Sequence, residues 1–392
     1  MKRKEFIRNS AIAAVGLSLL SGCESDSNSV VSDGPESEVP PFPYVEVSGS
    51  NYEIGKKIGE HFKPIFEEFF RLNEAMIQNL LGLAESEPEK YYNPFYNAAI
   101  ENFPQYVDEL KGMADGSGIP FKTFMCFNLV MEIMIRYNVG NPGAPIDAFR
   151  FGCSDISYSS VGKTIMAHNE DFFASMNDLM YVAKVSVPGK PTFVGLNYPG
   201  LIIGIAPGMN EAGLVQTGNF ISLLQVADGI PWAFLARSIL DHQNLSDAVA
   251  SLESPLSSYS QHYQIGSFTE NKITAVEFAA GNYEHKNLNG FYVHTNHLIL
   301  PEMKDLPQAP DGTTFQRYDI LSAYADEYKD KIDQVDSDKM ISWLSNHDGY
   351  PDYVCAHGLT KTVSSSVFNF QDKSWRLYKG NPCYGYYKTI RI

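Results

Sequence analysis

The sequence predicts an α+β fold in which two β-sheets stack face to face between layers of helices. Three observations predict it. Apolar residues recur at helical spacing before residue 137. Short β-branched and aromatic segments, separated by turn residues, dominate after Cys153, and pairs of helical patterns interrupt them. Hydrophobic residues make up 44% of the 392 residues, which is enough to fill a large core, and no internal repeat is evident.

The helical part begins near Ser50. Pro64 is expected to kink or split its first helix, because proline removes a backbone donor and its ring collides with the preceding turn. A second helical stretch ends in the glycine-rich segment 109–120, and residues 121–137 form a further apolar helix. Residues 138–148 are rich in Gly and Pro, which predicts a loop.

The strands expected after Cys153 are short and rich in β-branched or aromatic residues, and they lie at 164–168, 181–187, 192–198, 201–206, 263–269, 273–279, 291–295, 364–369 and 374–379. The helices expected between them lie at 232–240, 246–252, 316–328 and 337–344.

The first 43 residues are expected to lie outside the fold. A basic start and a short apolar run lead into Leu20-Ser21-Gly22-Cys23, which resembles the lipobox of bacterial lipoproteins. Residues 1–23 are therefore predicted to be a lipoprotein signal peptide with Cys23 as the lipidated residue. Residues 24–43, rich in Ser, Asp, Glu and Pro, are predicted to be a flexible tether. The expected location is the bacterial cell envelope, lipid-anchored and facing the periplasm or the cell surface.

The composition excludes some classes of partner. A formal charge of −16 argues against nucleic acid, because phosphate binding requires a basic face. Nothing after residue 30 is apolar for long enough to span a bilayer, so contact with a membrane is expected through the lipid anchor only. The sequence predicts no oligomeric state.

The Gly152-Cys153 pair is the candidate reactive centre. Cleavage between these residues would make Cys153 a new N-terminus, with a thiol and a free amine side by side. An N-terminal residue thereby supplies its own base, since an α-amine and a thiol titrate at about 7.7–8.0 and about 8.5. Glycine leaves the attacked carbonyl uncrowded. Residues 44–152 and 153–392 would then be two chains of one domain.

Five cysteines occur in the chain, at positions 23, 126, 153, 355 and 383. An oxidising compartment permits a disulfide, and we expect Cys355 to pair with Cys383, although spacing does not determine connectivity. No CxxC pattern is present. His294 and His297 are three residues apart on an expected strand and so point to opposite faces, which argues against a shared metal. We expect neither a metal nor an organic cofactor.

Seven short segments, in this order, resemble a known family: Ser50–Gly55, Glu109–Pro120, Gly152-Cys153, Asn169–Asp171, Gly208–Leu214, Thr295–His297 and Gly380–Cys383. The family is the N-terminal-nucleophile hydrolases related to acyl-CoA:isopenicillin N acyltransferase, with conjugated bile salt hydrolases and acid ceramidase as more distant relatives. The resemblance covers residue 44 to the C-terminus. It implies a four-layer αββα sandwich with a helical leader, made as a precursor that is cut before the catalytic cysteine.

Carried over by position, the resemblance implies roles for three residues. Cys153 matches the nucleophile, and Asp171 matches the acid that holds its amine. Asn296 matches the oxyanion-hole side chain, whose amide donates a hydrogen bond to the developing negative charge without changing protonation state.

Four further residues are expected to contact substrate. Asn219 lies where bile salt hydrolases place a polar pocket residue, although Asn beside Gly is also typical of a turn. Arg237 and Arg317 match positions that often carry arginine; each could pair with Asp171 or a substrate carboxylate, or form an ordinary ion pair on a helix surface. His168 replaces an arginine of bile salt hydrolases, which argues against bile salts as substrate.

The sequence thus predicts a self-processing cysteine hydrolase that cleaves a linear amide or transfers its acyl group, with a small-molecule amide or acyl compound as its substrate. A bile salt or N-acyl amino acid hydrolase is an alternative within this class. A non-catalytic surface lipoprotein that binds ligands is an alternative outside it, and there Cys153 would be merely structural.

Overall fold

The computed structural model describes residues 42–140, 152–309, 313–349 and 353–392. The predicted signal peptide with Cys23, and nearly all of the tether, lie outside the described residues. So does most of the predicted loop 138–148, whose first three residues end helix α9 (Val130–Gly140). Among the described residues, no helix is both long enough and apolar enough to cross a membrane.

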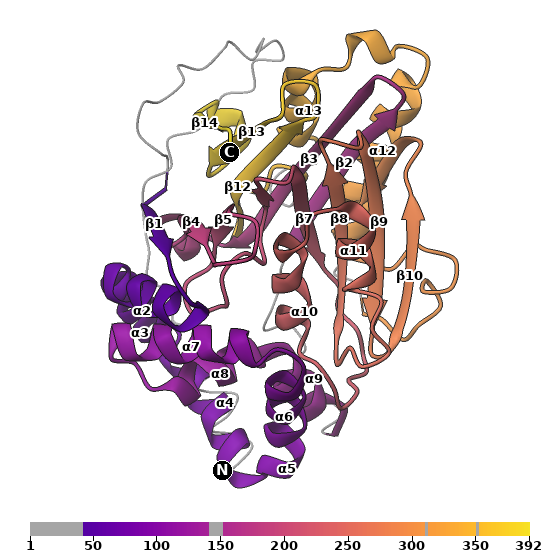
Figure 1. The fold of residues 1–392 in the computed structure, drawn as a ribbon. Helices are drawn as coiled ribbons and strands as arrows, with labels where there is room; N and C mark the ends of the chain where they lie inside the picture. Colours follow the sequence, from indigo (N-terminus) through magenta and orange to yellow (C-terminus); the bar gives the residue numbers. More distant parts are fainter. Residues whose placement is uncertain (1–41, 141–151, 310–312, 350–352) are drawn as a thin grey trace, which may run out of the picture.

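Two sheets form the centre of the molecule (Figure 1). The larger sheet has the strand order β1 (Tyr44–Ser48), β4 (Tyr181–Ser186), β5 (Phe193–Asn197), β6 (Gly208–Asn210), β7 (Leu214–Phe220), β8 (Ser260–Ser267), β9 (Lys272–Ala279), β10 (Asn282–Asn287). The smaller has the order β11 (Gly290–His294), β2 (Gly152–Ser160), β3 (Lys163–Phe173), β12 (Thr360–Asn369), β13 (Ser374–Lys379), β14 (Tyr387–Ile390). Neighbouring strands are antiparallel except for β1 and β4, which are parallel.

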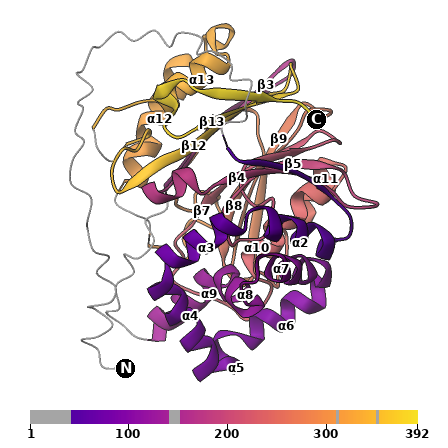
Figure 2. The same cartoon turned by 90° about the vertical axis from the view of Figure 1, so that its left-hand side faces the viewer.

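Helices cover the outer face of each sheet (Figure 2). Helices α12 (Thr314–Tyr328) and α13 (Ser337–Leu344) lie over the smaller sheet, and α10 (Trp232–Ser238) and α11 (Leu245–Ala250) lie over the larger one together with the N-terminal helices. The four layers are therefore helix, sheet, sheet and helix, which confirms the predicted αββα sandwich with its helical leader.

The helical leader contains α2 (Asn51–His61), α3 (Lys63–Leu72), α4 (Glu74–Ser86), α5 (Pro88–Tyr91), α6 (Asn93–Asn102), α7 (Pro104–Ser117), α8 (Phe121–Asn128) and α9. The split at Pro64 is confirmed, because this proline lies in the first turn of α3. Backbone N–H groups in a first turn have no partner within the helix, so a missing one breaks no helical hydrogen bond. Helices α2 and α7 cross at unusually close range. A β-carbon built on Gly55 would lie 2.0 Å from the carbonyl oxygen of Glu109. Glycine is therefore required at this crossing, where two of the segments that resemble the family meet.

Strands β2 and β3 form a hairpin around a tight turn at Val161-Gly162, where Gly162 has a φ of +87°. This turn sets the register, so that Gly152 lies opposite Asp171 and Cys153 lies opposite Glu170. Strand β2 is not among the predicted strands because polar residues occur on both of its faces. The hairpin places the Gly152-Cys153 bond beside two carboxylates.

The predicted strand at 201–206 is wrong. Gly200 and Gly204 both have positive φ values, which turn the chain away from the sheet. Buried side chains replace the missing strand partners: Asn128 accepts from the N–H of Ile202 at 2.8 Å, and Asn197 accepts from that of Gly204 at 2.8 Å. This irregular segment becomes part of a cavity wall.

The predicted disulfide is also absent from this structure. The sulfurs of Cys355 and Cys383 lie 3.8 Å apart, and both thiols are free. The two cysteines were therefore predicted correctly as neighbours, but they are not bonded.

Candidate active site

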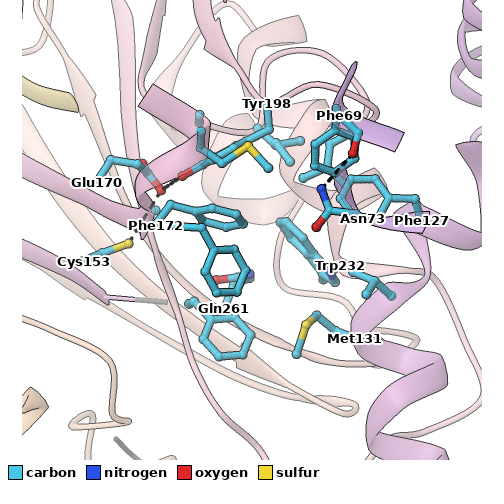
Figure 3. Close-up of a pocket in the computed structure, with 18 of the residues that line it drawn as sticks. Phe69, Asn73, Phe127, Met131, Cys153, Glu170, Phe172, Tyr198, Trp232 and Gln261 are labelled. Carbon is cyan, nitrogen blue, oxygen red and sulfur yellow. Dashed lines mark hydrogen bonds between the residues drawn. The ribbon is translucent and has the colours of Figure 1, made fainter. Parts of the chain in front are cut away.

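Cys153 is the second residue of strand β2 and is buried, and Figure 3 shows its sulfur close to Glu170. Its thiol is 3.7 Å from Oε1 of Glu170, the residue opposite it on β3. Burial raises the pKa of the Cys153 thiol well above its usual range, and the nearby carboxylates of Glu170 and Asp171 raise it further. The thiol is therefore protonated at neutral pH and needs a base before it can attack.

Asn296 follows strand β11 and contacts the same residue from the other side. Its Oδ1 accepts a hydrogen bond from the backbone N–H of Cys153 at 2.9 Å, and its Nδ2 donates to the carbonyl of Phe220 at 2.9 Å. An amide nitrogen carries two hydrogens, so Asn296 retains a second donor. The structure thus places this side chain against the backbone of Cys153, and its predicted role as an oxyanion donor stays a prediction.

Arg317, on α12, also contacts the backbone of Cys153, at its carbonyl. Its guanidinium donates to the Cys153 carbonyl at 2.5 Å, to Ser154 Oγ at 2.9 Å and to Asn296 Oδ1 at 2.6 Å. Three fixed donor directions on a planar group hold the backbone and the Asn296 amide in one geometry. Among the alternatives predicted for Arg317, the ion pair on a helix surface is excluded, because only 2% of the residue is exposed.

Asp171 lies on the opposite face of β3 from Glu170, next to Gly152. A β-carbon built on Gly152 would lie 3.0 Å from Asp171 Oδ2, so only glycine fits here without displacing the carboxylate. Thr362 donates to Asp171 Oδ1 at 2.6 Å. Burial raises the pKa of Asp171 to about 7, although the Arg317 charge opposes this. The acid predicted to hold the amine is therefore adjacent to the bond in question.

The buried His168 ring lies between two carboxylates and contacts both of them. Its Nδ1 lies 2.9 Å from Asp155 Oδ1 and its Nε2 lies 3.0 Å from Glu170 Oε2. Burial acts to lower the pKa of His168, but the two carboxylates outweigh it and raise this pKa to about 10. The ring is thus a cation at neutral pH and donates to both partners. Tyr198 completes the arrangement by donating to Glu170 Oε1 at 2.5 Å.

A cavity of about 90 Å³ opens beside the thiol. Figure 3 shows Cys153 and Glu170 at one end of it, and Trp232, Met131 and Phe127 around the far part. Its walls come from the leader helices, from strands β3, β7 and β8, from the start of α10 and from the irregular segment after Tyr198. They are almost entirely apolar and aromatic, with Glu170, Gln261 and Asn73 as polar exceptions. Such a cavity suits an apolar acyl or aryl group.

Three of the residues predicted to contact substrate do not line this cavity. Asn219 points away from the cavity, which its strand neighbours Gly218 and Phe220 line, because side chains alternate along a strand. It instead holds His294 Nδ1 and the carbonyl of Thr295, each at 3.0 Å. His168 lies between the sheets and does not line the cavity either.

Arg237 is the third predicted substrate-binding residue that does not line the cavity. Its guanidinium is fully buried and pairs with Asp241 at 2.8 Å and Glu109 at 3.3 Å, so its charge is already balanced inside the core. It reaches neither Asp171 nor the cavity.

Glu170 and Tyr198 were not predicted. The sequence does contain a signal for Glu170, which is the hairpin turn at 161–162. A turn at this place pairs residue 160 with residue 163, and the same register continued along both strands pairs Cys153 with Glu170. Tyr198 follows strand β5 of the larger sheet, and no local sequence pattern predicts its contact with Glu170.

Two sheets stacked between helices, with a cysteine opening an inner strand beside an amide and an acid, define the cysteine N-terminal-nucleophile hydrolase class. The comparison with known families agrees. The model of the acyl-coenzyme A:6-aminopenicillanic acid acyl-transferase family matches residues 159–384, which is more than half of the chain. The chain belongs to this family, whose members are hydrolases and acyltransferases acting on carbon–nitrogen bonds. The matched residues include Asp171, Asn296 and Arg317 but begin after Cys153.

Individual proteins are also similar. The beta-alanyl-dopamine/carcinine hydrolase of Drosophila melanogaster is 23% identical over 372 residues, covering 87% of this chain and 93% of the relative. Among solved structures, a variant of conjugated bile acid hydrolase from Clostridium perfringens aligns with a TM-score of 0.43 and 15% identity, over 61% of this chain and 97% of that one. Penicillin V acylase from Agrobacterium tumefaciens aligns with a TM-score of 0.36 and 15% identity, over 58% and 82% of the two chains.

Proposed function

We propose that this chain is a self-processing cysteine hydrolase that cleaves linear amides carrying an apolar acyl group. The observation that carries the proposal is the position of Cys153. Its thiol faces Glu170 and the cavity, while its backbone nitrogen is held by Asn296 beside Asp171. A lipid anchor at Cys23 in a bacterial cell envelope belongs to the same proposal.

In the uncut chain the Cys153 nitrogen is part of a peptide bond and cannot act as a base. Glu170 is then the acceptor that its thiol faces. The thiol gives its proton to Glu170 and attacks the carbonyl carbon of Gly152, forming an S–C bond. The C–N bond breaks as the proton passes to the departing nitrogen, which becomes the α-amine. Water then hydrolyses the thioester and frees the Gly152 carboxylate and the Cys153 thiol.

In the cut enzyme the α-amine takes over as the base. Asn296 Oδ1 and the Asp171 carboxylate lie where they orient it and stabilise its protonated form. The thiol attacks the acyl carbon of a substrate held in the cavity, and the ammonium returns the proton to the leaving amine. Water completes hydrolysis of the thioester, and a second amine or thiol in its place completes acyl transfer.

Changing Glu170 to Gln is expected to slow self-cleavage by about 10²-fold or more, the usual contribution of a positioned base. Glutamine preserves the size of the side chain but accepts no proton. Glu132→Gln is the matched control, because Glu132 is also a buried carboxylate and accepts from Ser258 and Trp232 rather than from the thiol. The measurement is the time course of the cleaved fraction on denaturing gels. Equal cleavage rates for Glu170→Gln and wild type would show that Glu170 is not the base in self-cleavage.

The acyl preference tests the function itself. A panel of amides with one leaving amine and acyl groups of increasing length is expected to show kcat/KM rising about fourfold per methylene until the cavity is full, since each buried methylene contributes about 0.8 kcal/mol. The panel includes β-alanyl amides, because the Drosophila relative is named for one, and a glycine-conjugated bile salt.

The variant Met131→Glu places a carboxylate in the cavity wall. It is expected to lower kcat/KM for apolar acyl amides at least tenfold while leaving self-cleavage intact, whereas Val139→Glu, on the exposed part of the same helix α9, changes neither. Cleavage of every acyl group at one rate would refute the role of the cavity. No turnover of any amide by the processed chain would favour a ligand-binding lipoprotein.

A further inference from the structure

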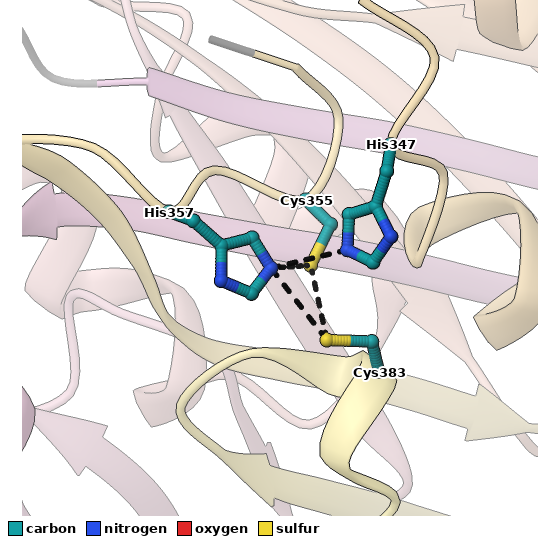
Figure 4. Close-up of side chains that lie close together, drawn as sticks. All are labelled: His347, Cys355, His357 and Cys383. Atoms are coloured by element: carbon teal, nitrogen blue, oxygen red, sulfur yellow. Dashed lines mark hydrogen bonds between the residues drawn. The ribbon is translucent and has the colours of Figure 1, made fainter. Parts of the chain in front are cut away.

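Four metal-ligating side chains converge on one point away from the cavity (Figure 4). His347 follows helix α13, Cys355 and His357 lie in the segment before β12, and Cys383 lies in the short helix η4 (Pro382–Tyr384). The ligand atoms all lie within 4.8 Å of one another. Three separate segments of the chain thus contribute to one cluster of two thiols and two imidazoles.

The distances between these atoms match the edges of a tetrahedron around zinc. The two sulfurs are 3.8 Å apart, and the two histidine Nε2 atoms are 3.1 Å apart. His357 Nε2 lies 3.4 Å from the Cys355 sulfur and 3.6 Å from the Cys383 sulfur. Zn–S bonds of about 2.3 Å and Zn–N bonds of about 2.0–2.1 Å at tetrahedral angles give about 3.8 Å between sulfurs, about 3.5 Å between S and N, and about 3.3 Å between nitrogens.

We propose that His347, Cys355, His357 and Cys383 bind one Zn²⁺ ion in a closed structural site. Two thiolates and two imidazoles in a tetrahedron are a donor set that zinc prefers. All four positions are filled by the protein, so no position is left for water or substrate. The ion would therefore hold chain segments together and take no part in amide chemistry.

Neighbouring groups support the ligands. Asn381 donates from Nδ2 to the Cys355 sulfur at 3.3 Å and to the Ala356 carbonyl at 2.7 Å. The N–H of Cys355 donates to the carbonyl of Asn346 at 3.1 Å. Donors aimed at a ligand sulfur stabilise the thiolate and fix its direction, as outer partners do in metal sites.

The cluster also connects to the candidate active site. Ala356, between two of the ligands, exchanges two hydrogen bonds with Thr362: its N–H donates to Thr362 Oγ1 at 2.9 Å, and its carbonyl accepts from the Thr362 N–H at 2.9 Å. The Thr362 hydroxyl thus accepts from Ala356 and uses its own hydrogen to donate to Asp171. Val354, one residue before the ligand Cys355, accepts from Asn169 Nδ2 at 2.6 Å. The ion would thus anchor the segment that positions Asp171.

The first test is the metal content of the purified full chain, prepared with Zn²⁺ in the medium and without chelator. Elemental analysis is expected to find about one zinc per chain. Cys383→Ser and His347→Gln, which remove ligands from different segments, are each expected to lower this at least fivefold. Cys126→Ala and His285→Asn are the matched controls, being a thiol and an imidazole outside the cluster, and are expected to retain the metal.

Exchange of the metal in the wild-type protein tests the site without relying on the folding of any variant. Exchange of the wild-type protein with Co²⁺ is expected to give the visible absorption of tetrahedral cobalt with thiolate charge-transfer bands. Intact mass under non-reducing conditions then reports the state of the thiols. A chain free of zinc and without cobalt bands, or a mass lower by two hydrogens with a Cys355–Cys383 disulfide, would overturn the proposal.

Discussion

Replacing Cys153 by alanine is expected to leave a single uncut chain and to lower amide turnover by about 10⁴-fold or more, to the background rate. One sulfur atom serves as nucleophile in both reactions, so no other residue replaces it. The fold is expected to survive, because alanine fills most of the same buried position without introducing a polar group. The measurements are the cleaved fraction on a denaturing gel and hydrolysis of the best amide of the panel.

Two companion variants separate chemistry from structure. Cys126→Ala removes another buried free thiol and is expected to process and turn over as wild type. Cys153→Ser retains a hydroxyl nucleophile and is expected to process slowly. Turnover by Cys153→Ala above one hundredth of the wild-type rate would show that Cys153 is a structural cysteine.

Replacing Asn296 by alanine is expected to have the next largest effect, a loss of about 10²–10³ in kcat, which corresponds to about 2.7–4 kcal/mol for one oxyanion donor. KM is expected to change little, because the negative charge on the substrate oxygen develops only in the transition state. Steady-state kinetics on processed enzyme, or single-turnover acylation if processing is slow, provide the measurement.

Asn296→Asp distinguishes the donor role from the anchoring seen in the structure. Aspartate keeps the oxygen that accepts from Cys153 and Arg317 but lacks the amide hydrogens. If Asn296 stabilises the oxyanion, kcat falls as far as in Asn296→Ala. Near wild-type turnover in Asn296→Asp would instead assign Asn296 to positioning the amine and Arg317.

The sandwich was predictable because its core strands follow the rules of buried β-structure. Segments such as β9 and β13 are β-branched or aromatic and end in turn residues. Strand β2 breaks the pattern, because buried Ser154, Asp155 and Ser157 occupy positions where a core strand is normally apolar. Ser154 accepts from Arg317 and Asp155 pairs with His168, so the strand that carries the candidate nucleophile does not follow the pattern from which the other strands are predicted.

The candidate site was predictable in its local parts and not in its long-range ones. Cys153, Asp171 and Asn296 follow from short segments that resemble the family, and the structure brings all three together. The contact of Arg237 with Glu109 could not be predicted, because the two residues are 128 positions apart in the sequence. The four-residue Cys/His cluster could not be predicted either, because its side chains are spread from residue 347 to 383 and form no CxxC pattern.

The central claim, that Cys153 becomes an N-terminal nucleophile, is tested most directly by an intact-mass spectrum of the purified wild-type protein beside Cys153→Ala. Self-cleavage gives two fragments in the wild type, one with the mass of residues 153–392, and one uncut chain in the variant. A single uncut chain in both samples would show that Cys153 has no free α-amine to act as the base, and Cys153 would then not be an N-terminal nucleophile.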